Sequence, residues 1–271
     1  MRIYDFNQLA ESQEFADLKV VLTIGVYDGL HHGHMRVLTK TLELSGEYKS
    51  VVITFAQNPK ALTGRYLYSK PLLSQRQSRQ FFANLGVDFL VVIDFSPEFS
   101  KLSGEEFIAR CCKMFSVQAL VVGEDFRCGH KADTGVEELK VLIKQCHEET
   151  KLIVPETFLL NDGRVDSSTL VREALIEGKV SLIETLLGRN YSVDLVQLPL
   201  KVTESALFFK IDQTEQLLPP PGVYQSVLNY SDGSRREATA RIDATQLVLT
   251  GEFPDNCSIT YDNLEFVKEF K

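Results

Sequence analysis

The sequence has little that would suit a membrane or a nucleic acid as a partner. No apolar run reaches about 18 residues, so we expect no transmembrane helix. Lysine and arginine number 29 against 37 aspartate and glutamate, which leaves a formal net charge of −8. Nucleic acids and anionic membranes call for a basic surface, so this balance argues against both. A small acidic ligand needs only a local positive pocket and is not excluded.

Cysteine is scarce and tryptophan is absent. The five cysteines are odd in number and form no CxxC pair, so we expect neither a disulfide framework nor a zinc site. Cys111 and Cys112 lie in an amphipathic helical stretch, which indicates packing residues rather than nucleophiles. The segment Met1–Asp5 lacks the apolar stretch and cleavage site of a signal peptide. The expected location is the cytoplasm, and a homo-oligomer is left open.

The length of 271 residues exceeds that of a typical single domain, so two domains are expected. Residues 19–188 alternate strand-like and helix-like segments. After about Tyr191, short apolar runs such as 223–228 and 246–250 stand between turn signals, which is an all-β pattern. We therefore predict an α/β domain at 1–190 and a small all-β, barrel-like domain at 191–271.

The predicted strands of the first domain are 19–24, 50–55, 87–93, 118–122 and 151–154. The predicted helices are 34–44, 74–85, 104–115, 136–147, 169–177 and 181–187. Ser103 and Glu106 fit a capping box that opens the third of these helices. Strands that alternate with helices of this length predict a parallel sheet. Ligands of such sheets bind beyond the carboxyl ends of the strands. We expect the chemistry after the first, fourth and fifth predicted strands.

Three of the five histidines fall within four positions directly after the first predicted strand. The segment Gly25–His34 reads GVYDGLHHGH and leads into a helix. A helix N-terminus offers unpaired N–H groups to a phosphate, and imidazole donors can stabilise charge that builds on phosphorus. Adjacent histidines cannot share one helical face and no carboxylate cluster stands nearby, so a metal site is disfavoured. The segment predicts phosphate binding.

A second cluster of polar residues follows the fifth predicted strand. Asp166–Arg172 reads DSSTLVR, with three hydroxyls before a helical run and a basic residue one turn later. A helix N-cap would need only one hydroxyl, whereas three with an arginine suit a polyphosphate cradle. A third stretch, Gly123–Gly129, reads GEDFRCG directly after the fourth predicted strand, where a plain turn is the alternative.

The ten-residue frame resembles the HxGH motif of nucleotidyltransferases, in the version found in prokaryotic FAD synthetases. DSSTLVR is similar to the SSTxxR motif of that superfamily, and GEDFRCG to its G-x-[N/D]-F-x-F-G stretch, with Cys128 in place of an aromatic residue. The resemblance covers roughly residues 20–190. It implies a Rossmann-like sheet of HxGH nucleotidyltransferase architecture that transfers AMP from ATP to FMN, giving FAD and pyrophosphate.

The resemblance also assigns roles to particular residues. His34 would contact the α-phosphate, and His31 would hold the leaving pyrophosphate with Arg172. His32 stands at the variable position of the motif, to which the resemblance assigns no role. Further contacts to ATP or FMN would come from Gly25, Tyr27, Asp28, Gly33, Asn58, Gly123, Asp125, Phe126, Ser167, Ser168 and Thr169. Mg²⁺ would bridge the phosphates with substrate oxygens and waters as most of its ligands, and Asp125 is the candidate protein contact to it. Asn58 lies in TFAQNP, where the family reads TFEPHP.

The C-terminal part resembles the riboflavin kinase module of bacterial FAD synthetases in short segments such as 218–224 and 264–270. The glycine-rich loop and PTAN segment of that kinase are missing after Arg189, and Gln246 stands in the place of its catalytic acid. Glutamine cannot accept a proton from a substrate hydroxyl, so we predict no riboflavin kinase activity. A structural cap, a dimerisation surface and a non-catalytic flavin site stay open as roles.

Two alternatives to FMN adenylylation stay open at this point. A related HxGH nucleotidyltransferase could use the same chemistry on another phosphorylated acceptor. A non-catalytic flavin- or nucleotide-binding regulator would fit the altered TFAQNP segment and the eroded kinase module, although it would have no need to keep His31, His34 and Arg172 together.

Overall fold

The computed structural model describes residues 1–62, 70–196, 198–203, 205–253 and 260–270. By its internal contacts the chain divides into two compact units. The first comprises residues 1–27, 33–69 and 78–165, and the second comprises 28–32, 70–77 and 166–271. The predicted functional division at residue 190 stays a prediction. Among the described residues, no helix combines the length and the apolar character needed to cross a bilayer.

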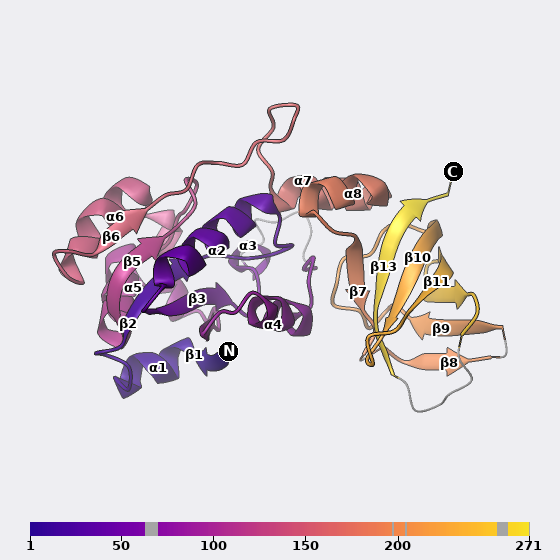
Figure 1. The fold of residues 1–271 in the computed structure, drawn as a ribbon, viewed down its shortest axis with the longest axis horizontal. Coiled ribbons are helices and arrows are strands. Elements are labelled where there is room, and N and C mark those ends of the chain that lie inside the picture. The colour runs from indigo at the N-terminus through magenta and orange to yellow at the C-terminus, as the bar shows by residue number, and fades with distance from the viewer. Residues whose placement is uncertain (63–69, 197, 204, 254–259, 271) are drawn as a thin grey trace. The chain divides into compact units, whose positions relative to one another are not determined.

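The first unit is built on a six-stranded sheet in the order β1-β4-β3-β2-β5-β6, in which every neighbouring pair is parallel (Figure 1). The strands are β1 Arg2–Asp5, β2 Lys19–Ile24, β3 Lys49–Phe55, β4 Phe89–Ile93, β5 Ser116–Val121 and β6 Lys151–Ile153. This confirms the predicted parallel sheet. The strands predicted first, fourth and fifth are β2, β5 and β6, which are direct neighbours in the sheet.

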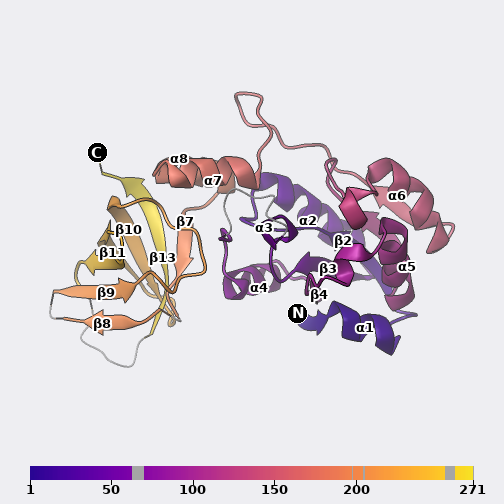
Figure 2. The same cartoon turned by 180° about the vertical axis from the view of Figure 1, so that it is seen from behind.

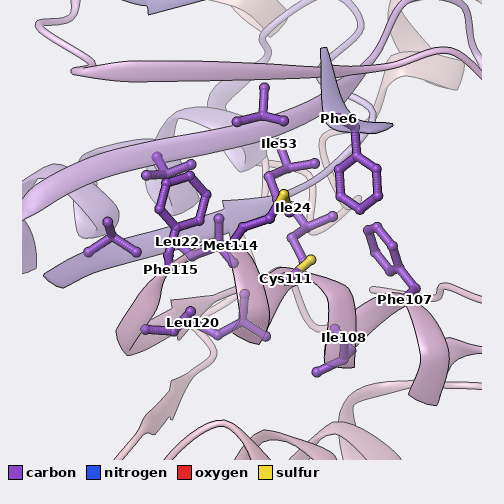
Figure 3. Packing of buried hydrophobic residues seen from close by; sticks show 14 of the residues in the cluster. Phe6, Leu22, Ile24, Ile53, Phe107, Ile108, Cys111, Met114, Phe115 and Leu120 are labelled. Atoms are coloured by element: carbon purple, nitrogen blue, oxygen red, sulfur yellow. The ribbon is translucent and has the colours of Figure 1, made fainter. Parts of the chain in front are cut away.

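Helices cover both faces of this sheet. The helices within residues 6–142 are α1 Phe6–Ser12, α2 His32–Ser45, α3 Pro59–Leu62, α4 Gln75–Asn84, α5 Gly104–Met114 and α6 Val136–Leu142. On one face, apolar residues of α1, α5 and α6 pack with Leu22, Ile24 and Ile53 of the central strands (Figure 3). On the other face, Val37 of α2 packs with Val21, Ala119 and Val121. The central strands are therefore buried on both sides, which explains their continuous apolar runs.

Local signals account for most of these elements. The capping box is confirmed: Ser103 Oγ accepts from the Glu106 N–H at 3.1 Å, and the Glu106 carboxylate accepts from the Ser103 N–H at 2.8 Å. The pair β1 and α1 was not predicted, because β1 is a short, partly exposed edge strand without an apolar run. The helix predicted for 136–147 is too long, since α6 ends at Leu142 and a 3₁₀ turn follows at Ile143–Gln145.

The expectation that the cysteines form no disulfide is wrong for one pair. Cys112 of α5 is joined to Cys146, just after the 3₁₀ turn, across 34 residues of sequence, with the two Cα atoms 4.9 Å apart. The spacing along the chain could not reveal this pair, because packing of α5 against the turn brings the two residues together. Cys111 is buried in the core as expected, and burial raises the pKa of its thiol.

The second unit is built on an open antiparallel sheet of seven strands in the order β7-β13-β10-β11-β12-β9-β8 (Figure 2). The strands are β7 Tyr191–Asp194, β8 Leu200–Val202, β9 Ala206–Lys210, β10 Gly222–Tyr230, β11 Arg235–Ile242, β12 Gln246–Thr250 and β13 Tyr261–Glu269. Alternate residues along β10, such as Tyr224 and Leu228, are buried while those between them are exposed or half-buried. This confirms the all-β pattern.

Two helices complete the second unit. These are α7 Ser168–Ile176 and α8 Val180–Leu187, and α8 packs against α7, β7 and β13. The segment 70–77 belongs to the same unit through several polar contacts. Arg76 makes a bidentate pair with Asp194 at 2.8 and 2.9 Å, and the Gln216 side chain donates to the Leu72 carbonyl at 3.1 Å.

The capping box gives a first prediction. Ser103→Ala removes the acceptor for the N–H of Glu106 and should lower the free energy of unfolding by about 1 kcal/mol. Ser103→Thr keeps the acceptor and should cost only a few tenths of a kcal/mol. Urea unfolding followed by circular dichroism measures both values. Equal losses for the two variants would show that the cap contributes nothing.

Candidate functional site

The turn that follows β2 has an unusual backbone. Gly29 has φ 84° and Leu30 has φ 50°, and Leu30 is wholly buried. The left-handed conformation costs a residue with a side chain roughly 1–2 kcal/mol, so the surrounding structure must hold Leu30 there. A Cβ on Gly29 would lie 2.8 Å from Leu72 Cδ1, which leaves no room for a side chain. The turn is therefore imposed by its neighbours.

An ion pair joins this turn to α7. The carboxylate of Asp28 pairs with the guanidinium of Arg172 and accepts from the Leu72 N–H at 2.8 Å. Arg172 is only 1% exposed and also donates to the Lys70 carbonyl at 2.6 Å. Ser168 Oγ donates to the carbonyl of Asp28 at 2.7 Å. The two motifs predicted to bind phosphate are thus bonded directly to each other.

His31 lies in the same unit and is 7% exposed. Its Nδ1 is 3.7 Å from a carboxylate oxygen of Asp166, which is itself buried. That oxygen accepts from the N–H of His32, the first residue of α2, at 2.9 Å. Burial, then the positive charges of His32 and Arg189, lower the pKa of His31 to about 4. The Asp166 carboxylate favours the charged imidazole, but burial outweighs it, so His31 is neutral at pH 7.

The three hydroxyls at the start of α7 have different surroundings. Ser167 is the N-cap and accepts from the Leu170 N–H at 3.3 Å, as the helix-cap alternative requires for one hydroxyl. Ser168 bonds to the Asp28 carbonyl. Thr169 is exposed. Of this cluster, Thr169 is the hydroxyl that a ligand could reach without displacing one of these bonds.

His34 and Tyr27 lie together in the first unit. The two rings meet edge to face, with centroids 5.3 Å apart and planes at 71°. The Tyr27 hydroxyl lies 2.5 Å from Thr23 Oγ1, which in turn donates to the Val121 carbonyl at 2.7 Å. Burial raises the pKa of Tyr27. A Cβ on Gly25 would lie 2.9 Å from Tyr27 Cζ, so the glycine makes room for the ring that packs against His34.

The stretch after β5 is a tight turn. The N–H of Phe126 donates to the Gly123 carbonyl at 3.1 Å, and the Phe126 ring packs on the core of the first unit. Asp125 is exposed, with one carboxylate oxygen 3.1 Å from where a Gly123 Cβ would lie. Cys128 bridges Thr134 by two backbone hydrogen bonds of 2.9 and 3.1 Å. Asp125 therefore has the open position that a ligand contact needs.

The remaining candidates are Asn58 and Gly33. The carbonyl of Asn58 accepts from the Ala61 N–H at 3.0 Å as α3 begins at Pro59. Gly33 is the second residue of α2. In the part of the chain that the structure describes, no group of three or more His, Cys, Asp or Glu side chains could hold a metal ion. A divalent cation would have to take most of its ligands from a substrate and from water.

The structure therefore groups the candidates within two units. Those in the second unit are Asp28, His31, Ser167, Ser168, Thr169 and Arg172. Those in the first are Gly25, Tyr27, Gly33, His34, Asn58, Gly123, Asp125 and Phe126. Sequence reasoning gave no role to Asp166 or Arg189, although both contact the turn at 29–32. The one sequence signal for Asp166 was its position directly before the hydroxyl triplet.

Comparison with known proteins identifies the family. The family model described as FAD synthetase matches residues 13–169, more than half of the chain. The chain belongs to the FAD synthetase family. This span contains the HxGH frame, the turn after β5 and the hydroxyl triplet, so the resemblance drawn from those motifs is confirmed at the level of the family.

This member of the FAD synthetase family spans a different share of each of its individual relatives. The FAD synthetase of Listeria monocytogenes serovar 1/2a is 28% identical over 241 residues, covering 87% of this chain and 93% of that one. The bifunctional riboflavin kinase/FMN adenylyltransferase of Escherichia coli K12 is 32% identical over 178 residues, covering 64% of this chain. That match spans 55% of the bifunctional protein, about half its length.

The fold also has a counterpart among solved structures. A crystal structure of a macrolide-efflux protein from Streptococcus pneumoniae superposes with a TM-score of 0.78, covering 93% of this chain and 94% of that one. The identity is 22%, so the likeness concerns the fold alone. Its coverage shows that the combination of a parallel and an antiparallel sheet recurs in another chain.

The lowered pKa of His31 gives a prediction for stability against pH. Because the folded pKa of about 4 lies below the unfolded value of about 6.5, the unfolded state binds more protons between these values. The free energy of unfolding should therefore fall by about 2–3 kcal/mol as pH drops from 7 to 4 on account of this group. His31→Asn should flatten that part of the pH profile, whereas the exposed His147→Asn should not. Identical profiles for both variants would contradict the burial of a neutral His31.

The ion pair gives a further prediction. Arg172→Met leaves the Asp28 carboxylate largely buried without its counter-charge, so the free energy of unfolding should fall by about 3–5 kcal/mol. The matched control is Arg164→Met, which breaks an exposed pair with Asp162 and should have little effect. Urea unfolding at pH 7 measures both. A small loss for Arg172→Met would mean that the pair does not fix the turn.

Proposed function

We propose that the chain catalyses transfer of AMP from ATP to FMN, giving FAD and pyrophosphate. The proposal rests on the agreement between the family to which the chain belongs and the position of its polar stretches in the sheet. Two of the polar stretches directly follow β2 and β5, which are adjacent in the parallel sheet, and the carboxyl edge of such a sheet is where ligands bind. The match to the FAD synthetase family supports FMN as the acceptor in preference to another phosphorylated compound.

The proposed reaction is an in-line displacement at the α-phosphorus of ATP. A phosphate oxygen of FMN forms the new P–O bond, and the bond from the α-phosphorus to the bridging oxygen breaks, so that pyrophosphate leaves with that electron pair. The nucleophile is already an anion at neutral pH and needs no general base. Catalysis then rests on positioning and on stabilisation of charge at the phosphorus and the leaving group.

His34 is proposed as the donor to the α-phosphate. It is the third residue of α2, where backbone N–H groups are also unpaired by the helix and favour an anion. The edge-to-face contact with Tyr27 supports a fixed ring orientation. His31 is proposed to contact the pyrophosphate as a neutral imidazole, consistent with its lowered pKa.

The hydroxyl cluster is proposed to act in two ways. Thr169, which is exposed, and the N-terminus of α7 would contact the leaving phosphates. Ser168 and Arg172 would act by holding the turn at Asp28, where their bonds lie, and a direct contact of Arg172 with phosphate would require that pair to open. The contacts of Gly25, Gly33, Asn58, Phe126 and Ser167 with ligands stay predictions.

Mg²⁺ is proposed as the cofactor. The described residues offer it no dedicated cage, and Mg²⁺ commonly keeps waters and binds one or two carboxylates together with substrate phosphates. The exposed carboxylate of Asp125 fits the protein's share of such a site. When bound, the ion would neutralise charge on the phosphates. The cytoplasmic location and an oligomeric state stay predictions from the sequence.

The second sheet is proposed to have no riboflavin kinase activity. Gln246, which stands in the place of the kinase's acid, is an exposed residue at the start of β12 and pairs with Lys210 of β9. A carboxamide cannot serve as a general base there. The chain would then use FMN and not riboflavin as its flavin substrate.

The test is a product assay. The purified full chain is incubated with Mg-ATP and either FMN or riboflavin, and the flavins are resolved by chromatography. FAD from FMN alone is the expected result. FAD from riboflavin would overturn the absence of kinase activity. No product from either flavin would favour the non-catalytic regulator, and turnover of another phosphorylated acceptor would favour a sibling transferase.

The role of His34 gives a separate prediction. His34→Ala should lower kcat for FAD formation from FMN about 10²–10³-fold, because it removes one donor to charge that develops in the transition state. The control is His147→Ala, at an exposed position outside the motifs, which should keep the original rate. An active His34→Ala variant would contradict the assignment.

A further inference from the structure

Arg189 approaches the turn at 29–32 from its carbonyl side. It follows Gly188, which ends α8 in the left-handed conformation with φ 67°. Its guanidinium donates to the carbonyl of Gly29 at 2.6 Å and to that of Leu30 at 3.1 Å. A third hydrogen bond of 3.2 Å goes to the Leu187 carbonyl. It fixes the guanidinium at the C-terminal end of α8, the helix that precedes Arg189. The planar fork of arginine suits such a set of acceptors.

Asp166 approaches the same turn from its N–H side. Its carboxylate accepts from the N–H of His32 at 2.9 Å, which is one of the N–H groups that α2 cannot satisfy internally. Asp166 is 3% exposed and immediately precedes Ser167, the N-cap of α7. A buried carboxylate is tolerated where helix N-termini and donors surround it.

The two residues together bracket His31. The carbonyls of the two residues before it are held by Arg189, and the N–H of the residue after it is held by Asp166. Between them, Leu30 keeps a left-handed backbone that is unfavourable for a leucine. Because a bond on each side fixes the peptide planes, the direction of the His31 side chain is set by these contacts and not by the local sequence.

We propose that Arg189 and Asp166 are positioning residues which hold the backbone of residues 29–32 and thereby direct His31 toward the phosphates of ATP. The proposal rests on the proposed function and adds two residues that act through His31. Neither of them is proposed to touch a substrate.

The charges facing His31 give the proposal a spectroscopic signature. They are Arg189, His32 and Asp166. Burial lowers the pKa of Arg189 to about 10, so it stays charged at neutral pH and disfavours the charged form of His31. Asp166 acts in the opposite direction. Removing one or the other should therefore move the pKa of His31 in opposite directions, whereas general loosening of the fold would move it up in both cases.

The experiment combines an NMR titration with steady-state kinetics on the full chain. The chain has five histidines, and the His31 resonance is identified by its loss in His31→Asn. Between pH 7.5 and 5, the wild-type His31 signal should not titrate. Arg189→Met should move the onset of its titration to higher pH than in the wild type and lower kcat about 10–100-fold, with a smaller change in KM. Arg189→Lys keeps the positive charge but loses the planar set of N–H donors. The kcat should therefore fall while His31 still does not titrate between pH 7.5 and 5.

Two variants at Asp166 separate charge from hydrogen bonding. Asp166→Asn keeps an acceptor for the His32 N–H, so kcat should fall less than threefold and His31 should stay untitrated. Asp166→Leu removes the acceptor and should lower kcat about 10–100-fold. The matched control is Leu249→Ala, which truncates a wholly buried side chain of β12 in the same unit. It should lower stability and leave both kcat and the His31 titration unchanged.

Two results would overturn the proposal. One is an Arg189→Met variant with wild-type kcat and a His31 titration that is unchanged from the wild type. The other is a Leu249→Ala variant that reproduces the changes of Arg189→Met, which would reduce them to loss of stability. If the wild type forms no FAD, the proposed function fails by itself. The positioning claim is then judged on the His31 titration and on the dissociation constant for Mg-ATP, which calorimetry measures for the same variants.

Discussion

The arrangement of the candidate site depends on one buried ion pair, that of Asp28 with Arg172. The pair joins the frame that precedes α2 to the helix that follows the hydroxyl triplet, although 144 residues separate them in sequence. Burial of both charges is tolerable because each has further partners, the Leu72 N–H for the carboxylate and the Lys70 carbonyl for the guanidinium. Without the pair, the left-handed turn at Gly29 and Leu30 would lack its anchor at the preceding residue.

Much of the fold was predictable because it follows from local patterns. Apolar β-branched runs predicted β2 and β3, and the Ser103–Glu106 pair predicted the start of α5. What was missed depends on distant contacts or lacks a pattern. The edge strand β1 has few buried residues, and the Cys112–Cys146 pair exists only because α5 packs against the turn at 143–145.

The site was predictable to a similar extent. Residue types and spacing predicted the histidine frame and the hydroxyl triplet as phosphate-binding elements, and both contribute residues to the second unit. Spacing could not reveal that Ser168 and Arg172 bond to Asp28, since that depends on where α7 lies in the fold. For the same reason Asp166 and Arg189 had no assigned role. An arginine or aspartate that bonds to a distant backbone leaves no periodic signal in the sequence.

The contacts of segment 70–77 bear on why the antiparallel sheet is retained. Lys70 donates to the Thr214 carbonyl, Gln216 to the Leu72 carbonyl, and Ser74 to Asp194. Through Leu72, this segment in turn bonds to Asp28. A sheet without a kinase motif thus buttresses the loop that begins the histidine frame, and a fragment ending at residue 190 would keep every motif while losing that support. The support that the sheet gives to the turn at Asp28 is reason enough for its retention, whatever chemistry the sheet itself performs.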